Sequence, residues 1–167
     1  MRVLENMHSM KQRKCFAMGF KAESLPSWIK VAGAVEELEN DSFVLIDEAG
    51  ISFNSRSSMS SANKLLSDLI LIARHKSLSI MFISQNSSNL EVNILRQADY
   101  LVLKPSSLLQ KDFERKIIQT IYAKTEKDFD KFSGDRGITY IYSPDFTGFV
   151  SNGLPSFWSD GMSKSFR

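Results

Sequence analysis

The stretch Phe43-Val44-Leu45-Ile46-Asp47-Glu48 decides the fold class. Its apolar run is typical of a central strand in a parallel sheet that helices cover on both faces. The run ends in two adjacent carboxylates, at the strand end where α/β sheets bind their ligands. An unpaired buried charge is costly, so this pair predicts either a ligand site or a cap for the following turn.

Apolar segments before and after this stretch predict an alternation of strands and helices. The helix predicted over 61–76 has apolar residues at three- and four-residue steps. An alternating order of this kind favours an α/β fold with a mostly parallel sheet and right-handed crossovers. The other predicted strands are 15–20, 78–84 and 100–103, and the other predicted helices are 3–10, 29–39, 89–98 and 107–132.

The helix predicted over 107–132 is long enough to cover a sheet. Its inward residues are predicted to be Leu109, Phe113, Ile117, Ile121 and Tyr122, and its outward residues Lys111, Asp112, Glu114 and Lys116. Lys111, Arg115 and Lys116 are interpreted as a solvated helix face.

The character of the chain changes after Gly137. Residues 138–142 and 148–150 predict two strands joined by the turn Ser143-Pro144-Asp145. We therefore divide the chain into a core over 1–136 and a C-terminal β-hairpin extension over 137–167. The aromatic residues Phe157 and Trp158 are expected to pack back on the core or against a partner.

Composition limits the class of protein. The chain has 167 residues, 43% of them hydrophobic, which is enough for an ordinary core. Its net charge of +2 gives no bulk attraction to nucleic acid. The single cysteine, Cys15, excludes an internal disulfide framework. No apolar stretch is long enough to span a bilayer and no signal peptide is recognisable, so a cytoplasmic location is expected.

A second predicted strand ends in Ser84-Gln85-Asn86. If the two strands are parallel, Gln85 lies at the same edge of the sheet as Asp47. A side-chain amide there can hydrogen-bond both a γ-phosphate and an attacking water. The alternative is that Gln85 and Asn86 are only turn residues.

The order of these features resembles the FtsK/HerA-type P-loop ATPases, which include conjugation coupling proteins, filamentous-phage assembly ATPases and archaeal viral packaging ATPases. The resemblance covers about residues 40 to 120. It rests on the strand ending in Asp47-Glu48, a helix ending in Arg74, the strand ending in Ser84-Gln85, and the apolar segment 99–104.

This resemblance implies a partial RecA-like P-loop NTPase core within a ring-forming, homo-hexameric motor. Such a motor hydrolyses ATP with Mg²⁺ and moves or packages DNA, here for a virus or a mobile element. By resemblance, Asp47 coordinates Mg²⁺ and Glu48 activates the attacking water. Gln85 and Asn86 contact the nucleotide, with Gln85 sensing the γ-phosphate.

The resemblance also implies an arginine finger. Arg74 is the candidate because it precedes the sensor strand, and Arg56 and Arg96 come next. The alternative for Arg74 is ordinary stabilisation of a helix C-terminus.

The chain departs from the family in one respect. The family has Gly-x-x-x-x-Gly-Lys-Ser/Thr, whose backbone N–H groups and Lys bind the phosphates, and this sequence contains no Gly-Lys pair. Either the chain begins inside the helix that follows the phosphate loop, which residues 1–14 favour, or the protein is a degenerate relative. In the first case this chain alone binds ATP weakly or not at all.

Two other functions stay open. One is a non-hydrolysing, Rossmann-like interaction module that docks through Phe157, Trp158 and the hairpin. The other is a metal-dependent nuclease or phosphotransferase that uses Asp47, Glu48 and Asp99.

Overall fold

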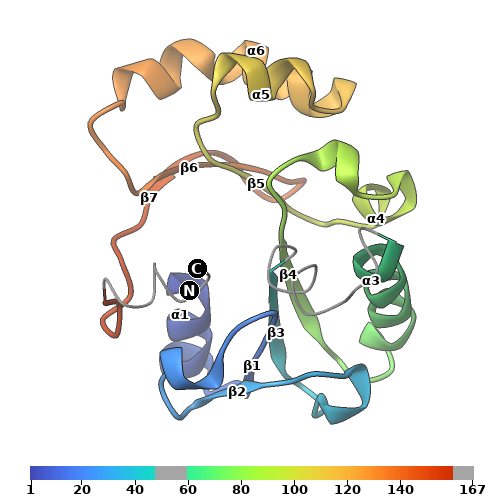
Figure 1. Ribbon diagram of the computed structural model, residues 1–167. Helices are drawn as coiled ribbons and strands as arrows, with labels where there is room; N and C mark the ends of the chain where they lie inside the picture. Colours follow the sequence, from blue (N-terminus) through green and yellow to red (C-terminus); the bar gives the residue numbers. More distant parts are fainter. Residues whose placement is uncertain (48–59, 160–167) are drawn as a thin grey trace. The chain divides into compact units, whose positions relative to one another are not determined.

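A computed structural model describes residues 1–47 and 60–159, which form two compact units (Figure 1). The first unit comprises residues up to Gln85 together with the stretch from Leu154, and the second comprises Asn86–Gly153. The boundary predicted between residues 136 and 137 falls inside the second unit. The division into a core and a C-terminal extension stays a prediction.

The first unit is built on a four-stranded sheet in which every pair of neighbouring strands is parallel, as predicted. The strand order is β2-β1-β3-β4. The strands are β1 (Cys15–Met18), β2 (Ile29–Val31), β3 (Phe43–Asp47) and β4 (Ser79–Ile83). The predicted strands at 15–20 and 78–84, and the predicted central strand that begins at Phe43, are thereby confirmed.

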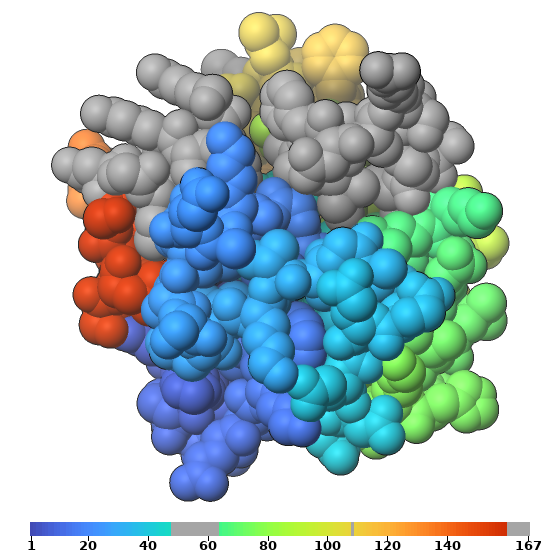
Figure 2. Space-filling view, turned by 60° about the horizontal axis from the view of Figure 1, so that its bottom comes forward, coloured from blue at the N-terminus to red at the C-terminus, as the bar shows by residue number. Residues whose placement is uncertain are grey.

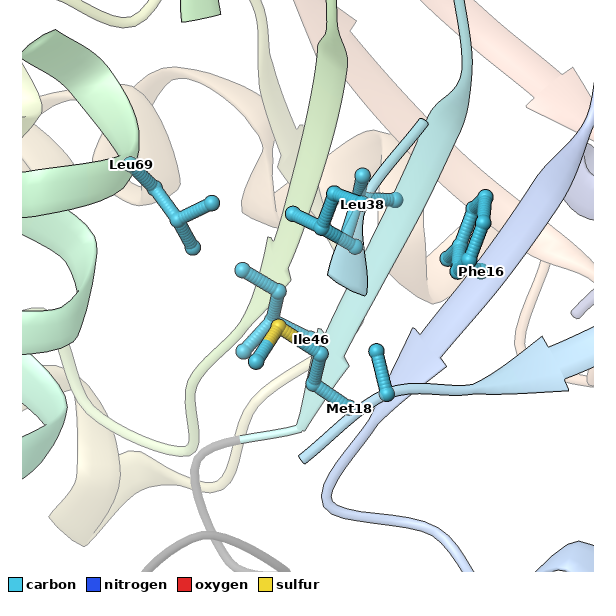
Figure 3. Close-up of a cluster of buried hydrophobic side chains, with 7 residues drawn as sticks. Phe16, Met18, Leu38, Ile46 and Leu69 are labelled. Atoms are coloured by element: carbon cyan, nitrogen blue, oxygen red, sulfur yellow. The ribbon is translucent and has the colours of Figure 1, made fainter. Parts of the chain in front are cut away.

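Alternate side chains of the central strands belong to two hydrophobic clusters, one on each face of the sheet. One cluster joins Phe16, Met18, Val44 and Ile46 to Leu69 of helix α3 (Ser60–Ala73), and Figure 3 shows Leu69 pointing toward Ile46. The opposite cluster joins Cys15, Ala17, Phe43 and Leu45 to Leu4 of helix α1 (Arg2–Lys11). Helix α3 covers one face of the sheet and helix α1 covers the other, which explains why β1 and β3 are apolar on both faces.

The helix predicted over residues 29–39 is wrong. Residues Ile29–Val31 form β2, and Val35–Glu37 form only a short 3₁₀ turn, η2. Ile29 and Val31 are β-branched, and their pairing with Cys15 and Ala17 outweighs a weak helix propensity that Gly33 lowers further.

The amino edge of the sheet is held together by Arg13. Its guanidinium donates hydrogen bonds to the carbonyls of Asp41 (3.0 Å), Ser42 (2.9 Å) and Ser77 (2.9 Å), and to Ser79 Oγ (2.7 Å). These bonds join segments that precede residue 48 to segments that follow residue 59, and Figure 2 shows the residues up to 47 (blue to cyan) lying against those after 63 (green).

Left-handed backbone surrounds this arginine. Gln12, Asp41 and Ser77 have φ angles of 50°, 58° and 53°, which non-glycine residues seldom adopt. The hydrogen bonds of Arg13 to the carbonyls of Asp41 and Ser77 stabilise two of these turns.

Glu39 should make the stability of the first unit depend on pH. Hydrogen bonds from Lys14 and then Lys30 lower the pKa of its carboxyl to about 2 from an ordinary 4.5. Since the folded-state pKa lies below the unfolded one, the contribution of Glu39 is present above pH 4.5 and is lost as the pH falls toward 2. Urea unfolding between pH 2 and 6 should show this loss in the native protein and a smaller one in Glu39→Gln. Half-exposed charges are screened by salt, so 0.5 M NaCl should reduce the difference in stability loss between the native protein and Glu39→Gln. Equal pH profiles of stability for the two proteins would contradict this role of Glu39.

The second unit contains an antiparallel sheet of order β5-β6-β7, made of Leu101–Leu103, Ile138–Tyr142 and Thr147–Ser151. The predicted hairpin β6–β7 is confirmed. The expectation that residues 100–103 extend the parallel sheet is wrong, because β5 pairs antiparallel with β6, with Val102 opposite Ile141. Leu101 and Leu103 then pack with Ile118, Tyr122 and Phe129 of helix α6 (Lys116–Lys131).

The long helix predicted over 107–132 is interrupted. Helix α5 (Leu108–Asp112) ends before Phe113, and α6 begins after Arg115, whose ψ of 147° is extended. The break separates the two apolar patterns. Ile121 and Tyr122 are buried as predicted, but Leu109, Phe113 and Ile117 are 74%, 69% and 51% exposed. The remaining short elements of this unit are the 3₁₀ turn η3 (Ser87–Asn89) and helix α4 (Val92–Arg96).

The stretch after Leu154 belongs to the first unit. Phe157 makes an edge contact with Trp28, with ring centroids 5.4 Å apart, and Trp28 stacks on His8 at 4.4 Å. The amide of Ser156 donates to Glu5 Oε1 at 2.9 Å. This stretch therefore completes the cluster between α1 and the sheet.

Candidate functional site at the carboxyl edge of the parallel sheet

Asp47 is the last residue of β3. The four residues before it are buried, and Asp47 itself is half-buried at the carboxyl end of the strand. The strand is apolar until this point, so packing fixes where the carboxylate emerges. Glu48, predicted as the catalytic carboxylate, lies outside the described residues.

Gln85 follows the neighbouring strand at the same edge. Asp47 pairs in register with Ile83, the last residue of β4, and Ser84 and Gln85 come next. Neighbouring strands lie about 4.8 Å apart, so Asp47 and Gln85 stand at the ends of adjacent strands. On the other side of β3, Met18 pairs with Ile46, and Gly19 turns the chain away with a φ of 85°. Three strands therefore end at one edge, as in α/β sheets that bind ligands there.

Arg74 lies at the opposite edge. It follows the end of α3, and the amide of Leu78 donates to the carbonyl of Ala73 at 2.8 Å just before β4 begins. The amino end of β4, Ser79, pairs with Phe43, and a five-residue strand such as β3 is roughly 13 Å long. Arg74, which is exposed, is therefore separated from Asp47 of its own chain by the length of the strand. A finger role for Arg74 requires a neighbouring subunit.

The other predicted residues belong to the second unit or are not described. Asn86 Oδ1 accepts a hydrogen bond from the Ser88 amide at 2.8 Å and so caps η3, which is a structural use of this side chain. Arg96 is exposed at the end of α4. Arg56 lies outside the described residues. Contact of Asn86 with a nucleotide stays a prediction.

The donor set at this edge suits a hard cation held by few protein ligands. Within residues 1–47 and 60–159, no three His, Cys, Asp or Glu side chains come together as a metal cage. Mg²⁺ characteristically keeps several waters and binds through one or two carboxylates plus the phosphates of its substrate. The carboxylate of Asp47 fits that mode. Asp99, which the nuclease alternative adds, precedes β5 in the second unit.

Two hydrogen-bond networks were not predicted from the sequence. One is the Arg13 network at the amino edge. The other, in the second unit, joins Glu114, Arg115 and Ser87. The predicted outward residue Glu114 is only 9% exposed and accepts a hydrogen bond from the Ser87 amide at 2.9 Å. Arg115 is half-buried, and its Nε donates to the Ser87 carbonyl at 2.9 Å. Their sequence spacing carries no signal for these partners, which lie more than one element away.

The second unit also has a shallow cavity of about 180 Å³ beside α6, lined in part by Ser106, Tyr122 and the ion pair Lys111–Glu126. Burial raises the pKa of the Tyr122 hydroxyl, which donates to the Lys104 carbonyl at 2.8 Å. This cavity contains none of the predicted site residues.

Comparison with known proteins gives no relative. No protein-family model matches the chain, and neither a curated protein nor a solved structure does. Among the described helices, none has the length and apolar character needed to cross a membrane.

Proposed function

We propose that the first unit is the metal-and-water half of a RecA-like nucleoside triphosphatase, part of an FtsK/HerA-type motor that moves DNA. The observation that carries this proposal is the pairing of β3 with β4, which sets Asp47 and Gln85 at the ends of adjacent parallel strands. A carboxylate and an amide side by side match the needs of phosphoryl transfer to water.

Each residue has a distinct role in this proposal. Asp47 holds Mg²⁺, which neutralises charge on the phosphates when it is bound. Glu48 accepts the proton of the attacking water. Gln85 donates its amide hydrogens toward the γ-phosphate and orients the water.

The proposal requires a phosphate-binding loop from other residues. No Gly-Lys pair occurs in the sequence, so this chain has no P-loop lysine to offer the β- and γ-phosphates. The unit described here therefore supplies one half of the site.

We also propose assembly into a ring, and the placement of Arg74 supports this part of the proposal. An exposed arginine at the amino edge is too far from its own Asp47 and is available to a neighbour's site. DNA as cargo rests on the family resemblance, since the net charge of +2 supplies no general attraction.

A nucleotide titration of the isolated chain tests the division of the site. We expect Mg²⁺-ATP to bind with a Kd of about 1 mM or weaker, because the chain has no Gly-Lys phosphate-binding loop. Mn²⁺, used in place of Mg²⁺, should broaden the NMR signals of the Asp47 and Gln85 amides. Asp47→Asn should remove this broadening and Arg74→Ala, at the opposite edge, should preserve it. Micromolar ATP binding would contradict the proposal. Broadening that persists in Asp47→Asn would also contradict it.

A further inference from the structure

The cavity beside α6 takes no part in the proposed function, and its wall combines aromatic rings with polar and charged side chains. It holds about 180 Å³, and the residues that line it all belong to the second unit. An apolar cavity of about 150 Å³ can hold a benzene molecule. The cavity beside α6 therefore has room for a small organic group of a similar size.

The wall of this cavity contains a buried hydroxyl whose lone pairs are unused. Ser106 Oγ is buried and accepts no hydrogen bond from the residues that the structure describes. The neighbouring Tyr122 hydroxyl cannot donate to it, because that hydroxyl donates to the Lys104 carbonyl at 2.8 Å. A buried polar atom without a partner destabilises a protein. A ligand that brings an N–H group to this oxygen would remove that cost.

The charges around the cavity leave a negative excess. Lys111 forms an ion pair with Glu126, so these two charges balance each other. The carboxylate of Asp135 interacts with the ammonium group of Lys104. Asp130 remains, because its carboxylate has no ion-pair or hydrogen-bond partner among the described residues. The cavity therefore favours a ligand with one positive charge.

The end of helix α6 has two further features that suit a planar organic cation. Phe129 and Phe132 line the cavity, and Phe132 is 43% exposed. Aromatic faces attract cations, and a guanidinium also stacks on them because it is planar and weakly hydrated. The last carbonyls of a helix carry partial negative charge, and α6 ends at Lys131. A metal ion fits less well, since no three His, Cys, Asp or Glu side chains of the described residues come together.

We propose that this cavity binds an alkylguanidinium group. Its charge pairs with Asp130, its N–H groups donate to Ser106, and its plane stacks on Phe132. A guanidinium presents several N–H donors in one fixed plane, so it can reach a carboxylate and a hydroxyl at once. The group can belong to a free small guanidine or to an arginine side chain of another protein. This inference does not rest on the proposed function.

An NMR titration of the whole chain with propylguanidinium chloride, at constant ionic strength, tests the site. We expect a Kd of about 1–10 mM, because the ligand has few atoms and the cavity is shallow. The amide signals of Ser106, Phe129 and Asp130 should shift, and those of the parallel sheet should not. Propylurea has the same shape without the charge, and it should bind about 10-fold more weakly. Equal affinity for propylurea, or no shift with about 50 mM propylguanidinium, would overturn the proposal.

Two substitutions on α6 provide a matched pair. Asp130→Asn should weaken propylguanidinium binding by about 5–10-fold, because the ligand loses its charged partner. Asp128→Asn is the control, since Asp128 pairs with Lys131 and neither residue lines the cavity. This control should change the Kd by less than about two-fold. An Asp130→Asn protein that binds as tightly as the native protein would overturn the proposal.

Ser106→Ala distinguishes a binding role of the hydroxyl from a structural one. Its removal should weaken propylguanidinium binding by about three-fold, because one hydrogen bond to the ligand is lost. The urea midpoint of the free protein should stay the same or rise, since the substitution removes an unsatisfied buried atom. A lower midpoint with unchanged affinity would show a structural role and would overturn the proposal.

Two further ligands identify the source of the group. A Gly-Arg-Gly peptide with blocked ends that binds more tightly than propylguanidinium assigns the site to an arginine of a partner protein. Equal or weaker binding of the peptide assigns it to a free guanidine, and either result supports a guanidinium site. Propylammonium has the same charge without the planar donors, so affinity equal to that of propylguanidinium would overturn the choice of a guanidinium.

Discussion

Glu48→Gln should lower ATP turnover by about 10²–10⁴-fold in an assembly that contains a phosphate-binding partner, while nucleotide binding is retained. Glutamine keeps the shape of the side chain but cannot accept the proton of the attacking water. The measurement is steady-state phosphate release together with the Kd of a fluorescent ATP analogue. Binding should stay within about two-fold, since the Glu48 carboxylate contributes to the transition state and not to holding the nucleotide.

Asp47→Asn provides the comparison at the neighbouring position. Loss of its charge should weaken Mg²⁺ binding, so the activity that remains should need a higher Mg²⁺ concentration. Turnover that is unchanged in Glu48→Gln would refute the ATPase proposal. If Mg²⁺-dependent DNA cleavage is lost instead, the nuclease alternative is favoured.

Arg13→Ala should lower the free energy of unfolding by about 2–4 kcal/mol. The guanidinium donates to four acceptors, including the carbonyl of Ser42, a residue with no exposed surface. Truncation removes four hydrogen bonds at once. Among the described residues, it also removes the side chain that joins Asp41, Ser42 and Ser77. Urea unfolding measured by circular dichroism gives the difference directly.

Two further variants separate geometry from charge. Arg13→Lys keeps the positive charge but has no planar fork, so most of the loss should remain. Lys11→Ala removes a nearby exposed charge and should change stability by less than about 0.5 kcal/mol. An Arg13→Ala protein as stable as Lys11→Ala would show that the hydrogen bonds at this edge add nothing.

The parallel sheet could be predicted because its strands are marked by local composition. β3 and β4 are apolar runs without interruption, and α3 between them has a clear apolar face. The edge that holds Asp47 and Gln85 follows from the order of these elements, as parallel strands end on the same side. This part of the candidate site was accessible from the sequence.

The rest depended on contacts between distant residues. The run Leu101–Leu103 suits either kind of sheet, and only its pairing with Tyr140–Tyr142 decides between them. The interruption before α6 reflects the burial of Glu114 against Ser87, which no helical period reveals.

The return of the chain after Leu154 fixes an order of events during synthesis. Residues 86–153 form a continuous unit that can complete its contacts once they have left the ribosome. The first unit cannot, because Phe157 and Ser156 reach residues near the N-terminus only after the whole inserted segment has been made. At translation rates of about 5–20 residues per second, Phe157 is synthesised about 6–26 seconds after Trp28. During that interval the cluster beneath α1 lacks the aromatic side chain of Phe157 that packs against Trp28.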